Sequence, residues 1–140
     1  MILADTGFFV ALANPRDRFH RVATDTLRAL RDPLVTTWPV LTETCHLLLG
    51  RLGVDAQERF LAGMKKGAAR VLPMEDRHLP RIEALMKKYR ALPMDLADAS
   101  LVIAAEELGQ GRILSTDQRD FGAYRWKNRK PFRNLLPEPS

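Results

Sequence analysis

Cysteine is almost missing from this sequence, since Cys45 is the only one among 140 residues. A single thiol excludes an internal disulfide and any zinc site built from several cysteines, so a bound metal would be held mainly by oxygen atoms. Apolar runs such as Phe8–Ala13 and Leu101–Ala105 are far shorter than the roughly 20 residues of a membrane-spanning helix. The first residues hold no basic leader followed by an apolar region and a cleavage site. We therefore expect a soluble, cytoplasmic protein that does not contact a membrane.

Repeats, low-complexity segments and Ser/Gly-rich linkers are absent too, and only 9 prolines and 8 glycines occur. With 46% hydrophobic residues, the chain is long enough for one core and too short for two, so we expect a single domain over residues 1–140. Negative charge is in deficit, because 17 aspartates and glutamates face 22 lysines and arginines. The resulting net charge of +5 favours a polyanionic partner such as nucleic acid, although a solvated surface accounts for it equally well.

The sequence does contain short apolar strands that alternate with amphipathic helices. Strands are expected at Ile2–Ala4, Leu34–Thr37, Arg70–Leu72 and Arg112–Ser115. Helices are expected around Phe8 to Leu12 and over Phe19–Leu30, Val40–Leu49, Ala56–Met64, Asp76–Tyr89 and Leu96–Leu108. Gly50 and Gly109 are interpreted as helix ends, and an edge strand is expected near Tyr124–Trp126. This alternation predicts an α/β fold of three layers, α/β/α, with a central parallel sheet of four to five strands.

Four acidic residues occupy related positions in these elements. Asp5 and Asp117 directly follow the first and fourth strands, Glu43 lies early in the helix after the second strand, and Asp98 lies in the first turn of the long helix. The carboxyl ends of parallel strands meet at one edge of a sheet, so we expect the four carboxylates to gather there, close enough to share an ion. Gathered carboxylates repel one another unless a cation lies among them, and Mg²⁺ or Mn²⁺ prefers such oxygen ligands. The pattern therefore predicts metal-dependent hydrolysis of a phosphodiester.

Each acid also has an ordinary structural interpretation. Asp5 and Asp95 are suitable N-caps for the helices that follow them, and Asp98 and Glu43 favour the dipoles of their helices with or without a metal. His46 lies one helical turn after Glu43 and could reach the same site, although a packed or exposed histidine is the simpler interpretation. Only the joint placement of the acids indicates catalysis.

At these positions the sequence resembles the PIN-domain ribonucleases, and among them the VapC-type toxins of toxin–antitoxin pairs. The resemblance rests on four segments that follow one another in the family's order and cover nearly the whole chain. They are Ile2–Phe8, Leu41–Thr44, Asp98–Ala105 and Leu114–Phe121. The resemblance implies a PIN-like fold, endoribonuclease activity dependent on Mg²⁺ or Mn²⁺, an RNA substrate, a homodimer and a small antitoxin partner.

The resemblance also implies roles for individual residues. Asp5 and Asp98 would be the principal metal ligands, Glu43 a supporting or water-mediated ligand, and Asp117 the fourth acid. The hydroxyls of Thr6 and Thr116 would orient carboxylates or substrate oxygens. Asp120 is the alternative to Asp117, because it lies only three residues further on, and Asp95 raises the same question beside Asp98. We assign Asp117 because it lies directly at the end of its strand.

The C-terminal region mixes basic and aromatic residues. The candidates for RNA contact are Arg125, Trp126, Lys127, Arg129 and Lys130. Such a mixture can bind phosphates while an aromatic ring stacks on a base. The same segment is equally consistent with an edge strand whose Trp126 packs inward.

Two other functions fit parts of the pattern. A phosphatase of the haloacid dehalogenase type needs a second aspartate two residues after the first, where Gly7 stands, and a receiver domain needs an aspartate after the third strand, where Leu72 to Met74 stand. The remaining alternative is a catalytically inactive RNA-binding or interaction module of the same fold. The presence of all four acids favours the enzyme.

Overall fold

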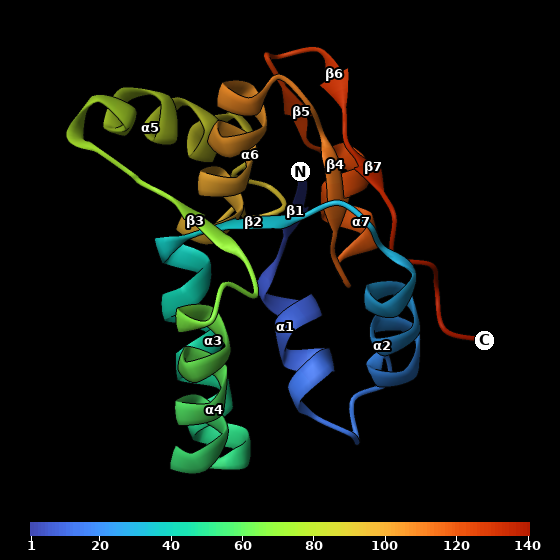
Figure 1. Cartoon of the computed structure of the whole chain (residues 1–140). Coiled ribbons are helices and arrows are strands. Elements are labelled where there is room, and N and C mark those ends of the chain that lie inside the picture. The colour runs from blue at the N-terminus through green and yellow to red at the C-terminus, as the bar shows by residue number, and fades with distance from the viewer.

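The computed structural model describes all 140 residues, and a five-stranded sheet lies at its centre. The strands are β1 (Ile2–Ala4), β2 (Leu34–Thr37), β3 (Arg70–Leu72), β4 (Arg112–Leu114) and β7 (Arg133–Asn134). They lie in the order β3-β2-β1-β4-β7, and every neighbouring pair is parallel (Figure 1). The prediction of a parallel sheet flanked by helices is confirmed. Because all five strands run the same way, the segments that follow them leave from one edge of the sheet.

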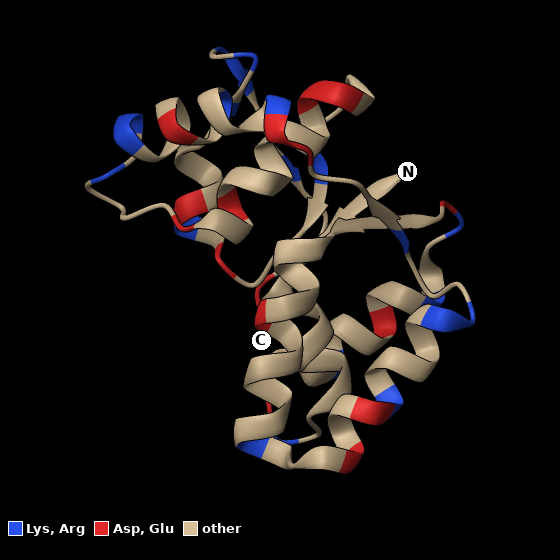
Figure 2. Cartoon of the chain, turned by 90° about the vertical axis from the view of Figure 1, so that its left-hand side faces the viewer, with Lys and Arg blue, Asp and Glu red and all other residues tan.

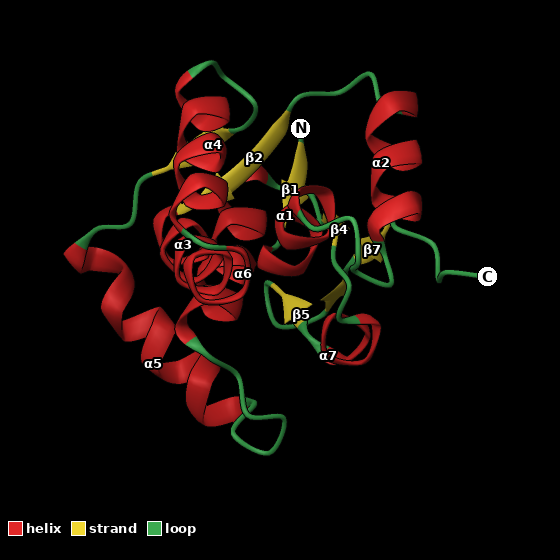
Figure 3. Ribbon diagram, turned by 90° about the horizontal axis from the view of Figure 1, so that it is seen from below, coloured by secondary structure: helices red, strands yellow, loops and turns green.

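Helices cover both faces of this sheet. They are α1 (Thr6–Ala13), α2 (His20–Ala29), α3 (Trp38–Leu52), α4 (Val54–Lys65), α5 (Leu79–Lys88), α6 (Leu96–Leu108) and α7 (Gln118–Ala123), with a 3₁₀ turn, η1, at Asp76–His78. Figure 3 shows α5 and α6 on one side of the sheet and α2 on the other. Most residues of α6 are buried, including every residue from Ala99 to Ala105, which is the behaviour of a helix enclosed by its neighbours. None of these helices has the length and apolar character needed to cross a membrane.

The prediction that Gly50 ends a helix is wrong. Helix α3 continues to Leu52 and ends at Gly53, which has a φ of +97°. Gly50 is exposed and has no atom near the position of a side chain, so it costs α3 only the modest helix propensity of one glycine. Gly53 needs its backbone freedom, whereas Gly50 does not.

The C-terminal region also differs from the prediction. The residues near Tyr124–Trp126 do not form the edge strand of the sheet: β5 (Arg125–Trp126) instead pairs with β6 (Lys130–Pro131) in a separate antiparallel hairpin. Lys127 and Asn128 form its turn with positive φ angles. The edge strand is β7, and the short helix α7 lies between β4 and the hairpin (Figure 1).

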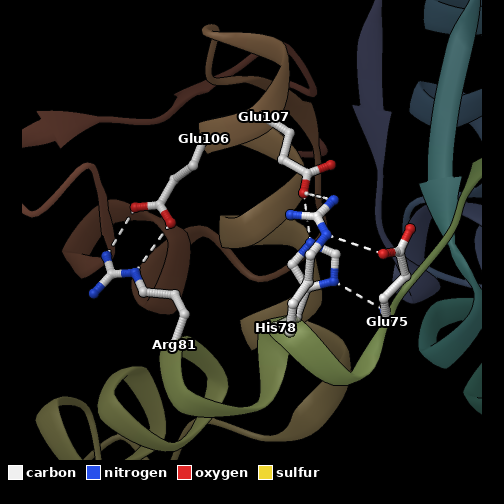
Figure 4. A network of polar contacts seen from close by, with 6 residues as sticks. Glu75, His78, Arg81, Glu106 and Glu107 are labelled. Carbon is white, nitrogen blue, oxygen red and sulfur yellow. Dashed lines mark hydrogen bonds and ion pairs between the residues drawn. The ribbon is translucent and has the colours of Figure 1, made fainter.

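A network of polar contacts joins α5 to α6 (Figure 4). The Nδ1 atom of His78 accepts the backbone N–H of Glu75, so the Nε2 atom carries the proton that is donated to Glu107. One turn along α5, Arg81 donates two hydrogen bonds to Glu106, at 3.0 and 2.8 Å. The network fixes α5 against the C-terminal half of α6, and the segment between the two helices then leads to the N-terminus of α6.

Candidate functional site

A cleft of about 350 Å³ opens where the strands β1 and β4 end. Its lining consists of Asp5, Thr6, Gly7, Val10, Asp17, Glu43, Leu47, Arg51, Pro93, Asp95, Asp98, Thr116, Asp117 and Asp120. All four acids expected at the site are among them, together with both alternatives, Asp95 and Asp120. Figure 2 shows acidic segments near the middle of the molecule, between the half that holds α5 and the half that holds α3.

Asp5 caps α1 and also lies at the base of the cleft. Its Oδ1 atom accepts the backbone N–H of Thr6 at 2.7 Å, and its Oδ2 atom accepts the hydroxyl of Ser115 at 2.8 Å. Burial raises the pKa of Asp5 to about 6, even though both hydrogen bonds act in the opposite direction. Asp5 is thus both the N-cap of α1 and an acid of the cleft, and Ser115 orients its carboxylate.

Ser115 is itself held by the last strand of the sheet. The side-chain amide of Asn134 in β7 donates to the carbonyl of Ser115 at 2.9 Å, and its oxygen accepts the N–H of Ser115 at 3.2 Å. This pair of hydrogen bonds clamps the backbone that leads from β4 to Thr116 and Asp117. The orientation of Asp5 therefore depends on a residue near the C-terminus.

Asp98 is held by a buried tyrosine. The hydroxyl of Tyr124 donates to Oδ2 of Asp98 at 2.8 Å. The pKa of Asp98 is raised to about 8, mainly by burial and in smaller part by the negative charges of Asp5 and Asp95. Burial, followed by the charge of Asp98, also raises the pKa of Tyr124, which keeps its proton available for this bond. Asp95 acts as the N-cap of α6, because its Oδ1 atom accepts the N–H of Asp98 at 2.8 Å.

Asp117 and Asp120 lie at the start of α7 and differ in their partners. Asp117 caps the helix by accepting the N–H of Asp120 at 2.9 Å, and burial raises its pKa. Asp120 is buried, and its carboxylate accepts Nε–H of Arg119 at 3.1 Å. Of the two acids, Asp117 therefore has no paired cation and Asp120 has one.

Glu43 and Thr6 also line the cleft. Burial raises the pKa of Glu43, and the neighbouring carboxylate of Asp95 raises it further. The side chain of Thr6 is buried beside Glu43, and its hydrogen bond to Glu43 lowers the pKa of that carboxyl against the effect of burial.

Thr116 restricts the residue that position 7 accepts. A Cβ atom on Gly7 would lie 1.9 Å from Oγ1 of Thr116. We expect Gly7→Ala to displace Thr116 and to lower the free energy of unfolding by about 1–3 kcal/mol, measured by urea denaturation. Gly50→Ala is the matched control, because nothing lies within 4 Å of its Cβ position; we expect a gain of roughly 0.5–1 kcal/mol. Equal effects of the two substitutions would contradict the steric interpretation.

The basic C-terminal residues do not line this cleft. The hairpin that carries Arg125, Trp126, Lys127, Arg129 and Lys130 packs at the opposite end of α6, where the N–H of Lys127 donates to Glu106. Trp126 is buried and donates its indole N–H to the carbonyl of Pro131, so its ring is not free to stack on a base. The inward-packed interpretation of Trp126 is the one that the structure supports.

Four residues near the cleft were not identified from the sequence as site residues. Asp17 and Arg51 line it, while Ser115 and Tyr124 hold its acids. The four-residue spacing from Glu43 through Leu47 to Arg51 could have indicated that Arg51 shares a helix face with Glu43. Tyr124 has no comparable signal, because its contact with Asp98 joins residues 26 positions apart.

The lining fits a hard divalent cation. Carboxylates dominate it, and burial together with mutual charge disfavours their ionised form unless a cation is bound. The expectation that the four carboxylates lie close enough to share one ion is wrong in this respect: they line one cleft, but no three carboxylate, imidazole or thiol groups are placed to hold a metal ion together. A cation in the cleft would therefore be held by one or two protein carboxylates, with water and substrate oxygens completing its shell, as is common for Mg²⁺.

Comparisons with known proteins give one consistent family. The family model described as "PIN domain" matches residues 2–127. Among curated proteins, Ribonuclease VapC26 of Mycobacterium tuberculosis is 26% identical over 124 residues, which covers 89% of this chain and 92% of the relative. Among solved structures, M. tuberculosis VapC20, described as a sarcin–ricin loop cleaving toxin, matches with a TM-score of 0.79 and 22% identity, over 85% of this chain and 92% of that one. At this identity the structural likeness shows the fold alone.

Proposed function

Since the chain belongs to the PIN domain family, we propose that it is an endoribonuclease that hydrolyses RNA phosphodiester bonds in the acidic cleft. The observation that carries this proposal is the convergence of Asp5, Glu43, Asp98 and Asp117 from four separate segments in one cleft. The printed function of VapC26, a ribonuclease related over most of both chains, supports the same reaction.

Asp5 and Asp98 would hold Mg²⁺ or Mn²⁺, with Glu43 and Asp117 acting directly or through water. When bound, the ion would supply positive charge that lowers the pKa of a water molecule and offsets negative charge on the phosphodiester. Ser115 and Tyr124 hold the two principal carboxylates in place through their hydroxyls. Such supporting hydrogen bonds fix the orientation of ligands and their basicity.

Arg51 is the residue of the cleft best suited to bind substrate. It lies in the last turn of α3, is exposed, and makes no ion pair with the acids of the cleft. A free guanidinium binds phosphate through two parallel hydrogen bonds. Arg51 would therefore attract an RNA phosphate to a cleft that otherwise repels it.

The relatives also suggest the biological setting. VapC20 is described as a toxin that cleaves the sarcin–ricin loop. We extend the toxin role, with a small antitoxin as its inhibitor and a homodimer as its assembly, to this chain. Co-expression with a candidate antitoxin should restore the growth of cells that express the protein, and light scattering should give twice the mass of one chain.

The activity is tested by incubating labelled RNA with the purified protein in Mg²⁺, in Mn²⁺ and in EDTA. We expect cleavage with either ion and none in EDTA. Cleavage that persists unchanged in EDTA would contradict the proposed mechanism, and the absence of cleavage under all conditions would favour the inactive RNA-binding module.

The bond from Tyr124 to Asp98 yields a separate prediction. We expect Tyr124→Phe to reduce cleavage by about 10- to 100-fold, because loss of a hydrogen bond to a ligand typically weakens metal affinity or activity by that amount. Raising the Mn²⁺ concentration should recover part of the loss, which a purely structural defect would not allow. Tyr89→Phe is the matched control, because the Tyr89 hydroxyl accepts the N–H of Arg125 and touches no acid of the cleft.

A further inference from the structure

A second hollow adjoins the acidic cleft. Its volume is about 640 Å³, and it shares Glu43 and Asp95 with the cleft. Its remaining walls come from the start of α3, from Met74 after β3 and from the start of α6. A group bound in the hollow would therefore lie directly beside a phosphate held in the cleft.

Trp38 is the most unusual residue of this hollow. It is the first residue of α3, and 59% of it is exposed although it is the largest apolar side chain available. Its indole N–H makes no hydrogen bond within the chain, in contrast to that of Trp126. A tryptophan that is more than half exposed and whose indole N–H has no partner in its own chain presents a flat ring to solvent.

The backbone of Trp38 is nevertheless firmly held. The preceding Thr37 is buried and its hydroxyl bonds to that of Ser100 in α6 at 2.6 Å. The hydroxyl of Thr42 donates to the carbonyl of Trp38 at 3.1 Å. The start of α3 is thereby fixed to α6, so the two walls of the hollow keep their positions.

The hollow combines polar and apolar groups on both of its helical walls. Trp38, Thr42 and His46 follow one another at four-residue spacing along one face of α3, next to Glu43. Across the hollow, Leu96 is 48% exposed at the start of α6. This combination suits a flat, uncharged ring that carries N–H groups on its edge, because an anion would be repelled by Glu43 and Asp95.

We propose that this hollow binds one nucleobase of single-stranded RNA beside the scissile phosphate, with its ring stacked on Trp38 and its edge facing Glu43 and Thr42. This proposal rests on the endoribonuclease function proposed above and adds a base-binding subsite to it. Stacking accepts any base, whereas carboxylate acceptors favour bases that carry an amino group, such as cytosine. The subsite would therefore prefer an amino-bearing base to uracil at one position next to the cut.

Cleavage assays test the subsite through paired changes in protein and RNA. We expect Trp38→Ala to lower kcat/KM by about tenfold or more, and Trp38→Phe to keep most of the activity. Removing a single base from the substrate, at one nucleotide next to the cut, should cost the wild-type protein a similar factor. The two losses should not multiply when Trp38→Ala acts on that abasic substrate. The matched control is Leu49→Ala, an exposed apolar residue of α3 outside the hollow, which should leave kcat/KM unchanged.

A binding measurement separates this proposal from the proposed activity. Trp38 and Trp126 are the only two tryptophans, and Trp126 is buried. In an Asp98→Asn background with Mg²⁺, short single-stranded oligoribonucleotides should quench the fluorescence of Trp38, and the quenching should disappear with Trp38→Phe. A wild-type protein that cleaves no RNA would overturn the enzymatic function, while the quenching alone would still decide whether a base binds.

Three results would overturn the subsite. The first is equal sensitivity of wild-type and Trp38→Ala proteins to every abasic position, and the second is the absence of quenching. The third is a change of molecular mass on Trp38→Ala substitution, measured by light scattering, because it would assign Trp38 to an interface between copies of the chain.

Discussion

Asp98→Asn is expected to reduce RNA cleavage by about a thousandfold or more, while making the metal-free protein more stable. The loss follows because a cation in the cleft supplies several kcal/mol of charge stabilisation, and each 1.36 kcal/mol corresponds to a factor of ten in rate. The gain in stability follows because burial raises the pKa of Asp98 to about 8, so its ionised form is disfavoured in the fold. Asparagine still accepts the Tyr124 hydroxyl but carries no charge. In EDTA at about pH 8, we expect the free energy of unfolding of Asp98→Asn to exceed that of the wild-type protein by about 1–3 kcal/mol.

Asp25→Asn provides the control for this substitution. Asp25 lies on α2, outside the cleft, and its carboxylate is 4.0 Å from Arg21 on the surface. We expect neither cleavage nor stability to change appreciably. An Asp98→Asn protein that still cleaves RNA at the wild-type rate would remove Asp98 from the mechanism, and one that is less stable in EDTA would show that its ionised form is favoured by the fold.

Mg²⁺ is expected to stabilise the protein strongly at about pH 8 and little at about pH 5.5. The folded-state pKa values of Asp5 and Asp98, about 6 and about 8, exceed the ordinary value of about 3.9. Between those limits the folded chain holds protons that the unfolded chain has lost, so these two groups lower stability as pH rises. Metal binding needs the ionised carboxylates, so protons compete with Mg²⁺ at the lower pH. Thermal unfolding in EDTA and in Mg²⁺ across this range measures both effects.

The double substitution Asp5→Asn with Asp98→Asn isolates the contribution of the two acids. Other ionisable groups titrate in the same pH range, and their contribution remains in the double variant. Subtracting its melting curve from that of the wild-type protein should leave a difference that grows with pH in EDTA. A wild-type protein that Mg²⁺ stabilises equally at both pH values would contradict the assignment of these carboxylates to the cation.

The sheet and most helices were predictable because local signals agree with the fold. Apolar β-branched or aliphatic runs predict β1 to β4, and an N-cap and a glycine C-cap delimit α6 at Asp95 and Gly109. The C-terminal region was not predictable, because its strands contain only two residues each and their partners are set by packing. Gly50 was misread for a different reason: one glycine in a helix costs only about 1 kcal/mol, which is too little to end α3 before Gly53.

Some residues of the candidate site were predictable from the sequence and others were not. Residues that follow strands, such as Asp5 and Asp117, could be assigned to one edge of a parallel sheet from their positions alone. The groups that orient them could not, because Ser115 reaches Asp5 across 110 positions and Tyr124 reaches Asp98 across 26. The basic hairpin was misleading for a related reason. Its composition suits RNA, but β5 pairs with β6 at the C-terminal end of α6, away from the acidic cleft.

Asn134 is translated after every acid of the cleft, although it clamps the backbone of Ser115 and thereby the orientation of Asp5. Chains leave the ribosome from the N-terminus, so all the carboxylates are present in the nascent chain before the strand that aligns them. A ribosome-bound chain should therefore acquire an ordered cleft only after Asn134 has left the ribosome.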